Sequence, residues 1–383
     1  MKVLILTNWY PHEGSEYEGV FVRDQAAALA LTQDVTLVSI RIISNNRWNL
    51  LKGGIRIIEE SRFNAYEVFV YKSFPIYNQL NFLIVSFWAL RKFLKSRTFD
   101  IIHAHTPFIA GNLSRIVSSR LKIPYVITVH NSPFTSLFRT KLHKYITLSA
   151  LNNADAVFSV SPLAAKEVAK YLKKDKRVHV VPNVVLTHKY IGNKGKYKIK
   201  GKINLGFLGG LNTDQKGLDV LFHAFALLRD RDDYFLHVGG NGELLETYKR
   251  LAADLKILDN IHFYGSIQPK VVPLFMASLD LFVLSSRHES FGVVVIEAMA
   301  AGVPVVATRC GGPESILTPE VGILAEIENP GSIATAIMKW RKNRDDYIAR
   351  TITEYVQKNF GEISFAHKVS VLYKSIMGVN NLK

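Results

Sequence analysis

Two glutamates eight positions apart have the residue type and spacing of a ligand-binding site. Glu289 is followed by Ser-Phe-Gly, and Glu297 is followed by Ala-Met-Ala-Ala. Residues 281–284 predict a buried strand, and residues 293–301 predict a helix. Glu289 then lies in the strand-to-helix loop, where backbone amides around Gly292 favour an anion. Two hydroxyl acceptors with anion-binding amides between them fit a sugar–phosphate–ribose ligand. The alternative is an ordinary helix with two salt-bridging acids.

A second group of candidate residues follows the predicted strand 203–208. Gly209 and Gly210 open a turn that leads to Lys216 and a predicted helix over residues 217–229. A lysine at such a turn is well placed to neutralise a diphosphate as it leaves. A solvent-facing lysine at a helix start is the alternative.

Two further turns lie at the same predicted strand ends. Gly240, in Gly-Gly-Asn-Gly, suits either a close backbone approach to a ligand or a tight turn. The turn at residues 265–267, which ends in Ile267, is expected to face a nucleotide base. Glu314 follows another glycine-rich turn and either belongs to the site or caps a helix.

Histidines and aspartates offer two more kinds of chemistry. His130 ends the predicted strand 125–130 and is expected at the ligand-binding edge, although lone histidines are usually structural. A zinc site with His103 and His105 is the alternative, but no acid or cysteine stands at ligand spacing. Residues 230–233, Asp-Arg-Asp-Asp, precede a strand and are interpreted as a solvated turn. No metal cofactor is therefore expected.

Short β-branched runs alternate with helical patterns along the 383 residues, which predicts α/β domains with parallel sheets. The pattern restarts near residue 203, so two Rossmann-like domains are expected, at 1–185 and 203–361, followed by a terminal helix at 362–383. The expected strands are 3–6, 35–40, 101–105, 125–130, 156–161, 178–182, 203–208, 235–239, 261–264, 281–284, 304–307 and 322–324; the clearest helices are 217–229, 243–255 and 331–343.

A lysine-rich segment, 184–202, is interpreted as a solvated linker. Ligands of such sheets bind beyond the carboxyl ends of the strands, which predicts a site in a cleft between the domains.

The Glu-x7-Glu spacing, with Phe-Gly inside it, resembles the motif of retaining glycosyltransferases of family 4 (group 1), which have the GT-B fold. The resemblance covers the whole chain, most strongly over 203–315 and least over 40–100. It implies that Glu297 holds the ribose hydroxyls and Glu289 the sugar hydroxyls. It also implies that the amides of Phe291, Gly292 and Val293 bind the diphosphate together with Lys216.

The resemblance extends to the first domain. Residues 19–26, beginning at Gly19, resemble the family's glycine loop, and His130 matches a histidine that orients the donor sugar. Many members carry an arginine where this chain has Gly210. The phosphate clamp is then either weaker or completed by Arg287 or by a side chain from the first domain.

The resemblance implies a retaining hexosyltransferase, with catalytic roles on His130, Glu289 and Lys216. The donor is a nucleoside diphosphate sugar, with UDP favoured, and the acceptor is a hydroxyl of a glycan or lipid-linked glycan in cell-surface polysaccharide synthesis. A catalytically silent partner subunit, or a GT-B phosphorylase or epimerase, remains as an alternative. An NAD dehydrogenase is disfavoured because no dinucleotide fingerprint follows either first strand.

Charge and composition indicate the partner. The net charge is +16, and residues 1–190 carry 25 Lys and Arg against 12 acids. This basic half favours an anionic acceptor or membrane surface over nucleic acid, since no nucleic-acid-binding motif accompanies it. The apolar and basic stretches 76–95 and 134–145 resemble interfacial helices but also ordinary amphipathic ones. A single cysteine and the absence of a recognisable leader predict a cytoplasmic protein, peripheral on the inner membrane face if the membrane contact exists.

Overall fold

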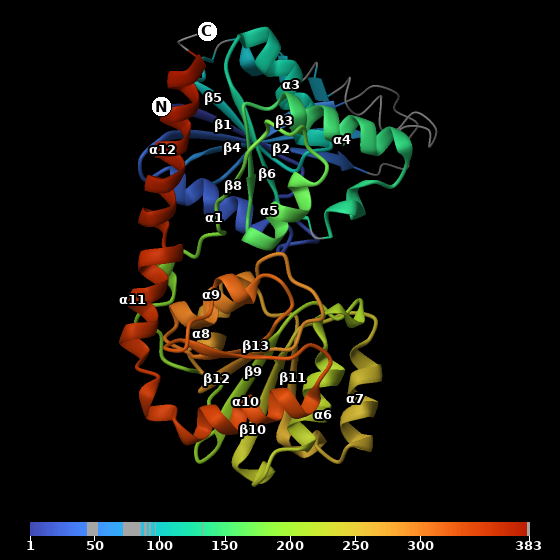
Figure 1. The fold of residues 1–383 in the computed structure, drawn as a ribbon, viewed down its shortest axis with the longest axis vertical. Helices are drawn as coiled ribbons and strands as arrows, with labels where there is room; N and C mark the ends of the chain where they lie inside the picture. The colour runs from blue at the N-terminus through green and yellow to red at the C-terminus, as the bar shows by residue number, and fades with distance from the viewer. Residues whose placement is uncertain are drawn as a thin grey trace. The chain divides into compact units, whose positions relative to one another are not determined.

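The computed structural model contains two compact α/β units (Figure 1). The first comprises Met1–Val184 together with Glu362–Lys383, and the second comprises Val185–Gly361. The structure describes residues 1–43, 53–71, 86–87, 90–91, 93–95, 97–131 and 133–380. Each unit has its own cluster of buried apolar side chains, as expected for a chain too long for one core.

Among the described residues, eight strands form the sheet of the first unit in the order β3-β4-β2-β1-β5-β6-β7-β8. Neighbouring strands are parallel except β3, which pairs with β4 in the antiparallel sense. The central strands are continuous apolar runs because helices cover both faces of the sheet. The strands are β1 (Lys2–Thr7), β2 (Asp34–Ile43), β3 (Gly53–Ile58), β4 (Asn64–Tyr71), β5 (Ile101–His105), β6 (Tyr125–Val129), β7 (Ala156–Ser159) and β8 (Val178–Val180).

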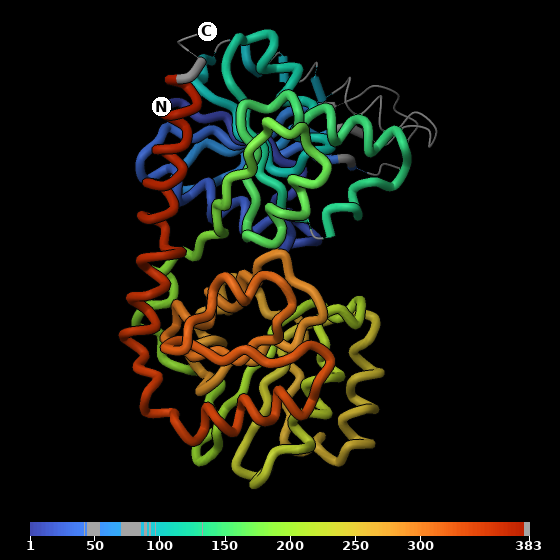
Figure 2. The backbone as a smooth tube through the Cα atoms, in the orientation of Figure 1, coloured from blue at the N-terminus to red at the C-terminus, as the bar shows by residue number. Residues whose placement is uncertain are grey.

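The helices of the first unit include one from the far end of the chain. They are α1 (Val20–Leu29), α3 (Ile109–Leu121), α4 (Lys141–Asn153), α5 (Pro162–Ala169) and α12 (Glu362–Asn380). Helix α12 packs against α1, and the red and blue segments can be followed side by side in Figure 2. Its Tyr373 is fully buried, and the hydroxyl lies 2.6 Å from Nδ1 of His103 on β5. The C-terminal helix therefore completes the core of the first unit.

The second unit holds a parallel sheet of six strands in the order β11-β10-β9-β12-β13-β14. The strands are β9 (Ile203–Leu208), β10 (Tyr234–Gly239), β11 (Ile261–Gly265), β12 (Leu281–Leu284), β13 (Val305–Thr308) and β14 (Gly322–Ala325). The helices are α6 (Leu218–Ala226), α7 (Leu245–Asp254), α8 (Val272–Met276), α9 (Val293–Ala300), α10 (Pro330–Lys342) and α11 (Ala349–Phe360). The order reverses direction at β9 and β12, whose carboxyl ends carry the predicted site. A reversal of this kind is where open α/β sheets bind ligands.

The predicted strands and the three predicted helices are present, with ends that differ by up to three residues. Two strands of the first unit, β3 and β4, were not predicted, and β3 adds an antiparallel edge to the predicted parallel sheet. Strand β3 is the edge strand of the sheet, and its Ile57 is 76% exposed. A half-exposed edge strand lacks the continuous apolar run by which the buried strands were recognised.

The lysine-rich segment is only partly the solvated linker that its composition predicts. The side chains of its lysines at 194, 196, 198 and 200 are exposed. However, the backbone amide of Tyr197 donates to Oγ of Ser278, and Nζ of Lys198 lies 2.8 Å from Asp280. The segment is thus fixed along the surface of the second unit. No helix within the described ranges has the length and apolar character needed to cross a membrane.

Candidate functional site

In the second unit, the start of α9 has the geometry of an anion-binding turn. Gly292 precedes the helix with φ of 96°, a left-handed conformation that side-chain-bearing residues avoid. The first amides of a helix have no acceptor within the helix, so those that follow Gly292 are available to a ligand. The side chain of Phe291 is 1% exposed and packs edge-to-face on Phe360, so Phe291 can offer a ligand only its backbone. Val293 is the first residue of the helix proper.

The predicted sugar-binding and phosphate-binding side chains meet in one ion pair. Nζ of Lys216 lies 2.6 Å from Oε1 of Glu289, and Oγ of Ser286 donates to the same oxygen at 2.8 Å. Glu289 is 9% exposed, whereas the Lys216 side chain is 29% exposed. The ammonium carries three donors, of which the carboxylate engages one. The pair can therefore present hydroxyl-accepting oxygen and phosphate-binding N–H groups from a single point.

The turn that carries Lys216 is tied to the loop that carries Glu289. Oγ of Ser285 donates to the Lys216 carbonyl, and the amide of Arg287 donates to the Gln215 carbonyl at 2.8 Å. The structure thus fixes the ends of β9 and β12 against each other through short hydrogen bonds, which preorganises the ion pair.

The prediction that Arg287 completes the phosphate clamp is not supported by its contacts. Its guanidinium forms a bidentate pair with Asp219, at 3.0 and 2.7 Å, and its Nε lies 2.7 Å from Glu328. Hydrogen bonding to Asp219 raises the pKa of Arg287, whereas burial alone would lower it. A bidentate arginine–carboxylate pair holds its geometry. In this structure Arg287 therefore holds neighbouring loops together through Asp219 and Glu328, and its role toward a phosphate stays a prediction.

The glycine-rich turns of the second unit pack on one another. A Cβ at Gly240 would lie 2.0 Å from the carbonyl oxygen of Gly209, so the tight turn by itself requires glycine at this position, and the approach of a ligand stays a prediction. Gly210 faces open space, which leaves the position of the family's arginine unfilled. The side chain of Ile267 is 8% exposed and packs toward Gly239, so a base would meet this turn mainly through its backbone.

Glu297 lies on α9, and its carboxylate has a partner that the sequence did not predict. The hydroxyl of Tyr190 donates to Oε1 of Glu297 at 2.9 Å. Glu297 is half-buried, whereas Tyr190 is 6% exposed. The ribose-binding candidate is thus held by a side chain from the segment that opens the second unit.

In the first unit, His130 follows β6 and belongs to a buried imidazole cluster. Its Nε2 lies 3.0 Å from Nδ1 of His105, and the two rings are nearly parallel at 15°. The ring of His103 stacks on His105, and His103 also contacts the hydroxyl of Thr128 at 2.6 Å. Because one nitrogen of the His105–His130 contact donates and the other accepts, each ring restricts the tautomer of the other.

Burial keeps the three rings neutral. Burial lowers the pKa of His105 to about 3. Burial, and then the neighbouring His105, hold the pKa of His130 well below its ordinary range. Burial also depresses the pKa of His103, with smaller contributions from His105 and His130. The cluster therefore places uncharged imidazole at the carboxyl ends of β5 and β6.

Aromatic side chains from the loop after β1 and from the first turn of α1 pack beside the His130 ring. The centroid of Phe21 lies 4.6 Å from that of His130, and Trp9 lies 6.4 Å away. Gly19 precedes α1 with φ of 67°, and its Cα is so close to the Trp9 backbone that a Cβ would lie 2.3 Å from the Trp9 carbonyl. The glycine loop, the aromatic pair and His130 thus form one group at the same sheet edge.

Comparisons with protein families give matches over both units. Residues 193–358 match the family model described as glycosyl transferases group 1, and residues 38–189 match the model described as glycosyltransferase family 4. The chain belongs to glycosyltransferase family 4. It is an enzyme that transfers a glycosyl group, in a family of retaining hexosyltransferases.

Individual relatives of this glycosyltransferase cover most of its length. An uncharacterized glycosyltransferase of Methanocaldococcus jannaschii is 29% identical over 84% of this chain and 87% of its own length. The alpha-monoglucosyldiacylglycerol synthase of Streptococcus pneumoniae is 26% identical over 79% of this chain and 74% of its own. The structure of Anabaena HepE in complex with UDP and glucose superposes with a TM-score of 0.73, at 17% identity, over 98% of this chain and all of that one. That likeness shows the GT-B fold.

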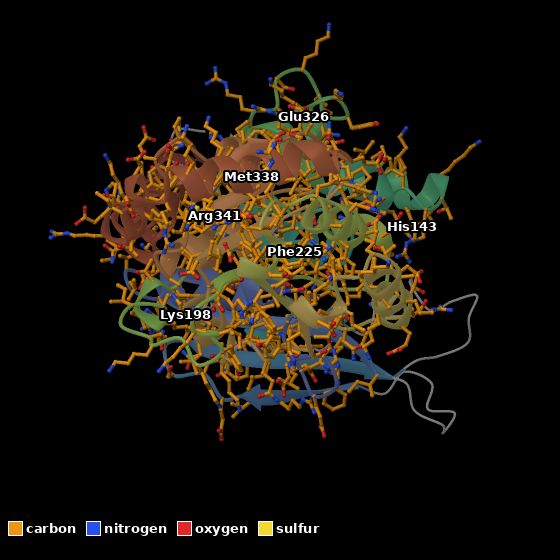
Figure 3. The ribbon with its side chains drawn as sticks, turned by 90° about the horizontal axis from the view of Figure 1, so that it is seen from below. His143, Lys198, Phe225, Glu326, Met338 and Arg341 are labelled. Atoms are coloured by element: carbon orange, nitrogen blue, oxygen red, sulfur yellow. The ribbon has the colours of Figure 1, made fainter. Side chains whose placement is uncertain are left out.

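The aspartate-rich turn of the glycosyltransferase is a structural feature, as predicted. Residues 231–233 form a short helix before β10, and Arg341 on α10 (Figure 3) pairs with Asp233 at 2.6 Å and with Asp230 at 3.8 Å. Within the described part of the chain, no group of three His, Cys, Asp or Glu side chains is arranged to hold a metal ion. The carboxylate of Glu314 serves its own turn, since both of its oxygens accept from the Gly311 amide.

Cys310 lies in the same turn and is inert by its surroundings. It is 3% exposed, and burial raises the pKa of its thiol to about 12. A buried thiol whose pKa is raised is a poor nucleophile, so these surroundings disfavour a catalytic role for Cys310.

Proposed function

We propose that the second unit binds a nucleoside diphosphate sugar through the α9 turn. Glu297 holds the ribose hydroxyls, the amides from Phe291 to Val293 and Lys216 hold the diphosphate, and Glu289 accepts hydrogen bonds from the sugar hydroxyls. The observation that carries the proposal is the 2.6 Å contact between Lys216 and Glu289 beside the start of α9, in a chain that belongs to family 4.

For the first unit we propose that His130 orients the donor sugar. A neutral imidazole suits this role because the anomeric carbon gains positive charge as its bond to phosphate breaks. The acceptor hydroxyl then attacks on the face that the phosphate leaves, and its proton passes to a phosphate oxygen. Lys216 stabilises the negative charge that develops on the departing diphosphate. The anomeric configuration is retained without a covalent enzyme intermediate.

UDP is the proposed nucleotide, on the support of the UDP-bound HepE fold. A thermal-shift panel of UDP, GDP, ADP and NAD, with and without EDTA, tests the donor site on wild type and Glu297→Ala. We expect UDP to raise the melting temperature of the wild type, with or without EDTA, and to leave that of Glu297→Ala unchanged. No shift with any nucleoside diphosphate would remove the active-transferase proposal and favour a silent partner subunit. Release of hexose phosphate from a glycan with inorganic phosphate would instead favour a phosphorylase.

We further propose that the acceptor is a hydroxyl of a lipid-linked glycan or glycolipid at an anionic membrane surface. Support comes from the exposed face at the start of α4, where Leu142 is 60% exposed and Tyr145 is 73% exposed. Three exposed basic side chains, Arg139, Lys141 and Lys144, flank them. The other candidate stretch, 76–95, lies mostly outside the described residues. The relative that makes a glucosyl lipid is consistent with such an acceptor.

Vesicle co-sedimentation tests the membrane contact. We expect the wild type to bind phosphatidylglycerol vesicles and to be released by 0.5 M salt, since each basic residue contributes roughly 1 kcal/mol near an anionic surface. Changing Leu142 and Tyr145 to serine should reduce binding at least about fivefold. Leu163→Ser, an exposed leucine on α5 of the same unit, is the matched control. Binding unchanged both by salt and by the double substitution would contradict the proposal.

A further inference from the structure

Tyr190 lies at the start of the second unit, where the sequence gives no sign of a ligand-binding residue. It follows a short helical turn, Thr187–Lys189, and precedes the exposed lysines at 194, 196, 198 and 200. Its ring is 6% exposed, and its hydroxyl donates to Oε1 of Glu297 at 2.9 Å. A segment 107 positions away in the chain therefore reaches the carboxylate assigned to the ribose.

The chemistry of this contact is directional. A carboxylate accepts about four hydrogen bonds and donates none, so a bond from Tyr190 leaves room for hydroxyl donors. A half-buried glutamate without such a bond samples several rotamers, and binding a ligand must then restrict them at an entropic cost. A hydrogen bond to a charged group is strong enough to select one rotamer.

We propose that Tyr190 is a positioning residue that holds Glu297 in the orientation required by the ribose hydroxyls. It thereby sets the preference of the site for ribonucleotides over 2′-deoxyribonucleotides. The inference rests on the proposed function, because it assigns the ribose to Glu297.

The Tyr190 ring and its hydroxyl have separable roles. The ring is buried and supports the fold of the segment, whereas the hydroxyl points to the carboxylate. Tyr190→Phe keeps the ring and removes the hydroxyl that donates to Glu297. Tyr355→Phe is the matched control, because it removes a half-buried tyrosine hydroxyl of the same unit that donates to the Ile316 carbonyl at 2.8 Å.

The experiment measures dissociation constants of UDP and 2′-deoxy-UDP by calorimetry for the wild type and both variants. We expect the wild type to prefer UDP by about tenfold, since a carboxylate deprived of one hydroxyl partner loses a charge-assisted hydrogen bond. In Tyr190→Phe we expect the affinity for UDP to fall by about fivefold and the affinity for 2′-deoxy-UDP to fall by less. The preference for UDP over 2′-deoxy-UDP should therefore become smaller than in the wild type. Tyr355→Phe should keep the wild-type preference.

Two results would overturn the inference while leaving the donor site in place. An equal loss of affinity for both nucleotides in Tyr190→Phe would mean that Tyr190 supports the fold and does not position Glu297. Tighter binding of UDP by Tyr190→Phe would mean that the tyrosine competes with the ribose. If neither UDP nor, in a parallel titration, GDP or ADP binds the wild type, the proposed function itself fails.

Discussion

Replacing Lys216 with alanine is expected to lower donor turnover by about 100- to 1,000-fold, the usual loss when one group that stabilises a developing negative charge is removed. Its ammonium is the cation that the structure places beside the α9 turn, 2.6 Å from Glu289. Without it, the leaving diphosphate would be held by backbone amides alone. The position of the family's arginine, Gly210, has no side chain to compensate. UDP affinity should fall as well, by about tenfold.

The measurement is the initial rate of UDP release from UDP-glucose and other UDP-hexoses, with UDP affinity followed in parallel. Lys249→Ala is the matched control, because Lys249 forms an exposed ion pair with Glu246 on α7 of the same unit. A variant that loses Lys216 also leaves the buried Glu289 carboxylate unpaired, which lowers stability. Lys216→Ala with Glu289→Gln removes that unpaired charge. If the Lys216 variant turns over donor at the wild-type rate, the phosphate role is wrong.

What the sequence predicts best is local. The Glu-x7-Glu element, the turn before Lys216 and the helix over Val293–Ala300 all follow from short-range periodicity and glycine placement. Their positions at neighbouring strand ends follow from the rule that parallel strands share one carboxyl edge. The ion pair between Lys216 and Glu289 joins the segments that follow two neighbouring strands of that edge, β9 and β12, so both residues could be named from the sequence, but not their contact.

Side-chain partners distant in the chain are what the sequence leaves undetermined. Arg287 has the charge for a phosphate clamp, but Asp219 offers it a bidentate carboxylate, and only the folded structure shows that the two meet. Tyr190 carries no motif at all and lies in a segment whose lysines indicate solvent. The contacts of Trp9 and Phe21 with His130 were missed for the same reason, although aromatic residues in the loop after a first strand and at the start of the next helix are a usable signal.

Replacing His130 with alanine is expected to separate sugar chemistry from nucleotide binding. UDP contains no hexose, so its dissociation constant should stay within about twofold of the wild-type value. Transfer from UDP-hexose should fall by about 100-fold, because the imidazole positions the sugar. His143→Ala is the control, since that histidine lies on α4 of the same unit and contacts Thr140. Equal losses in UDP binding and in transfer would instead indicate damage to the fold.

The pH dependence gives the same residue a second test. Burial holds the pKa of His130 well below its ordinary range, so the ring remains neutral as the pH falls through 6.5. His105, whose pKa is lowered to about 3, is neutral over the same interval and adds no charge beside it. An imidazolium here would oppose the positive charge that develops on the anomeric carbon. The value of kcat/KM should therefore show no decline near pH 6.5 attributable to His130. A decline near pH 6.5 in the wild type that disappears in His130→Ala would show that the ring titrates, and that the buried, neutral imidazole is not the form present in the working enzyme.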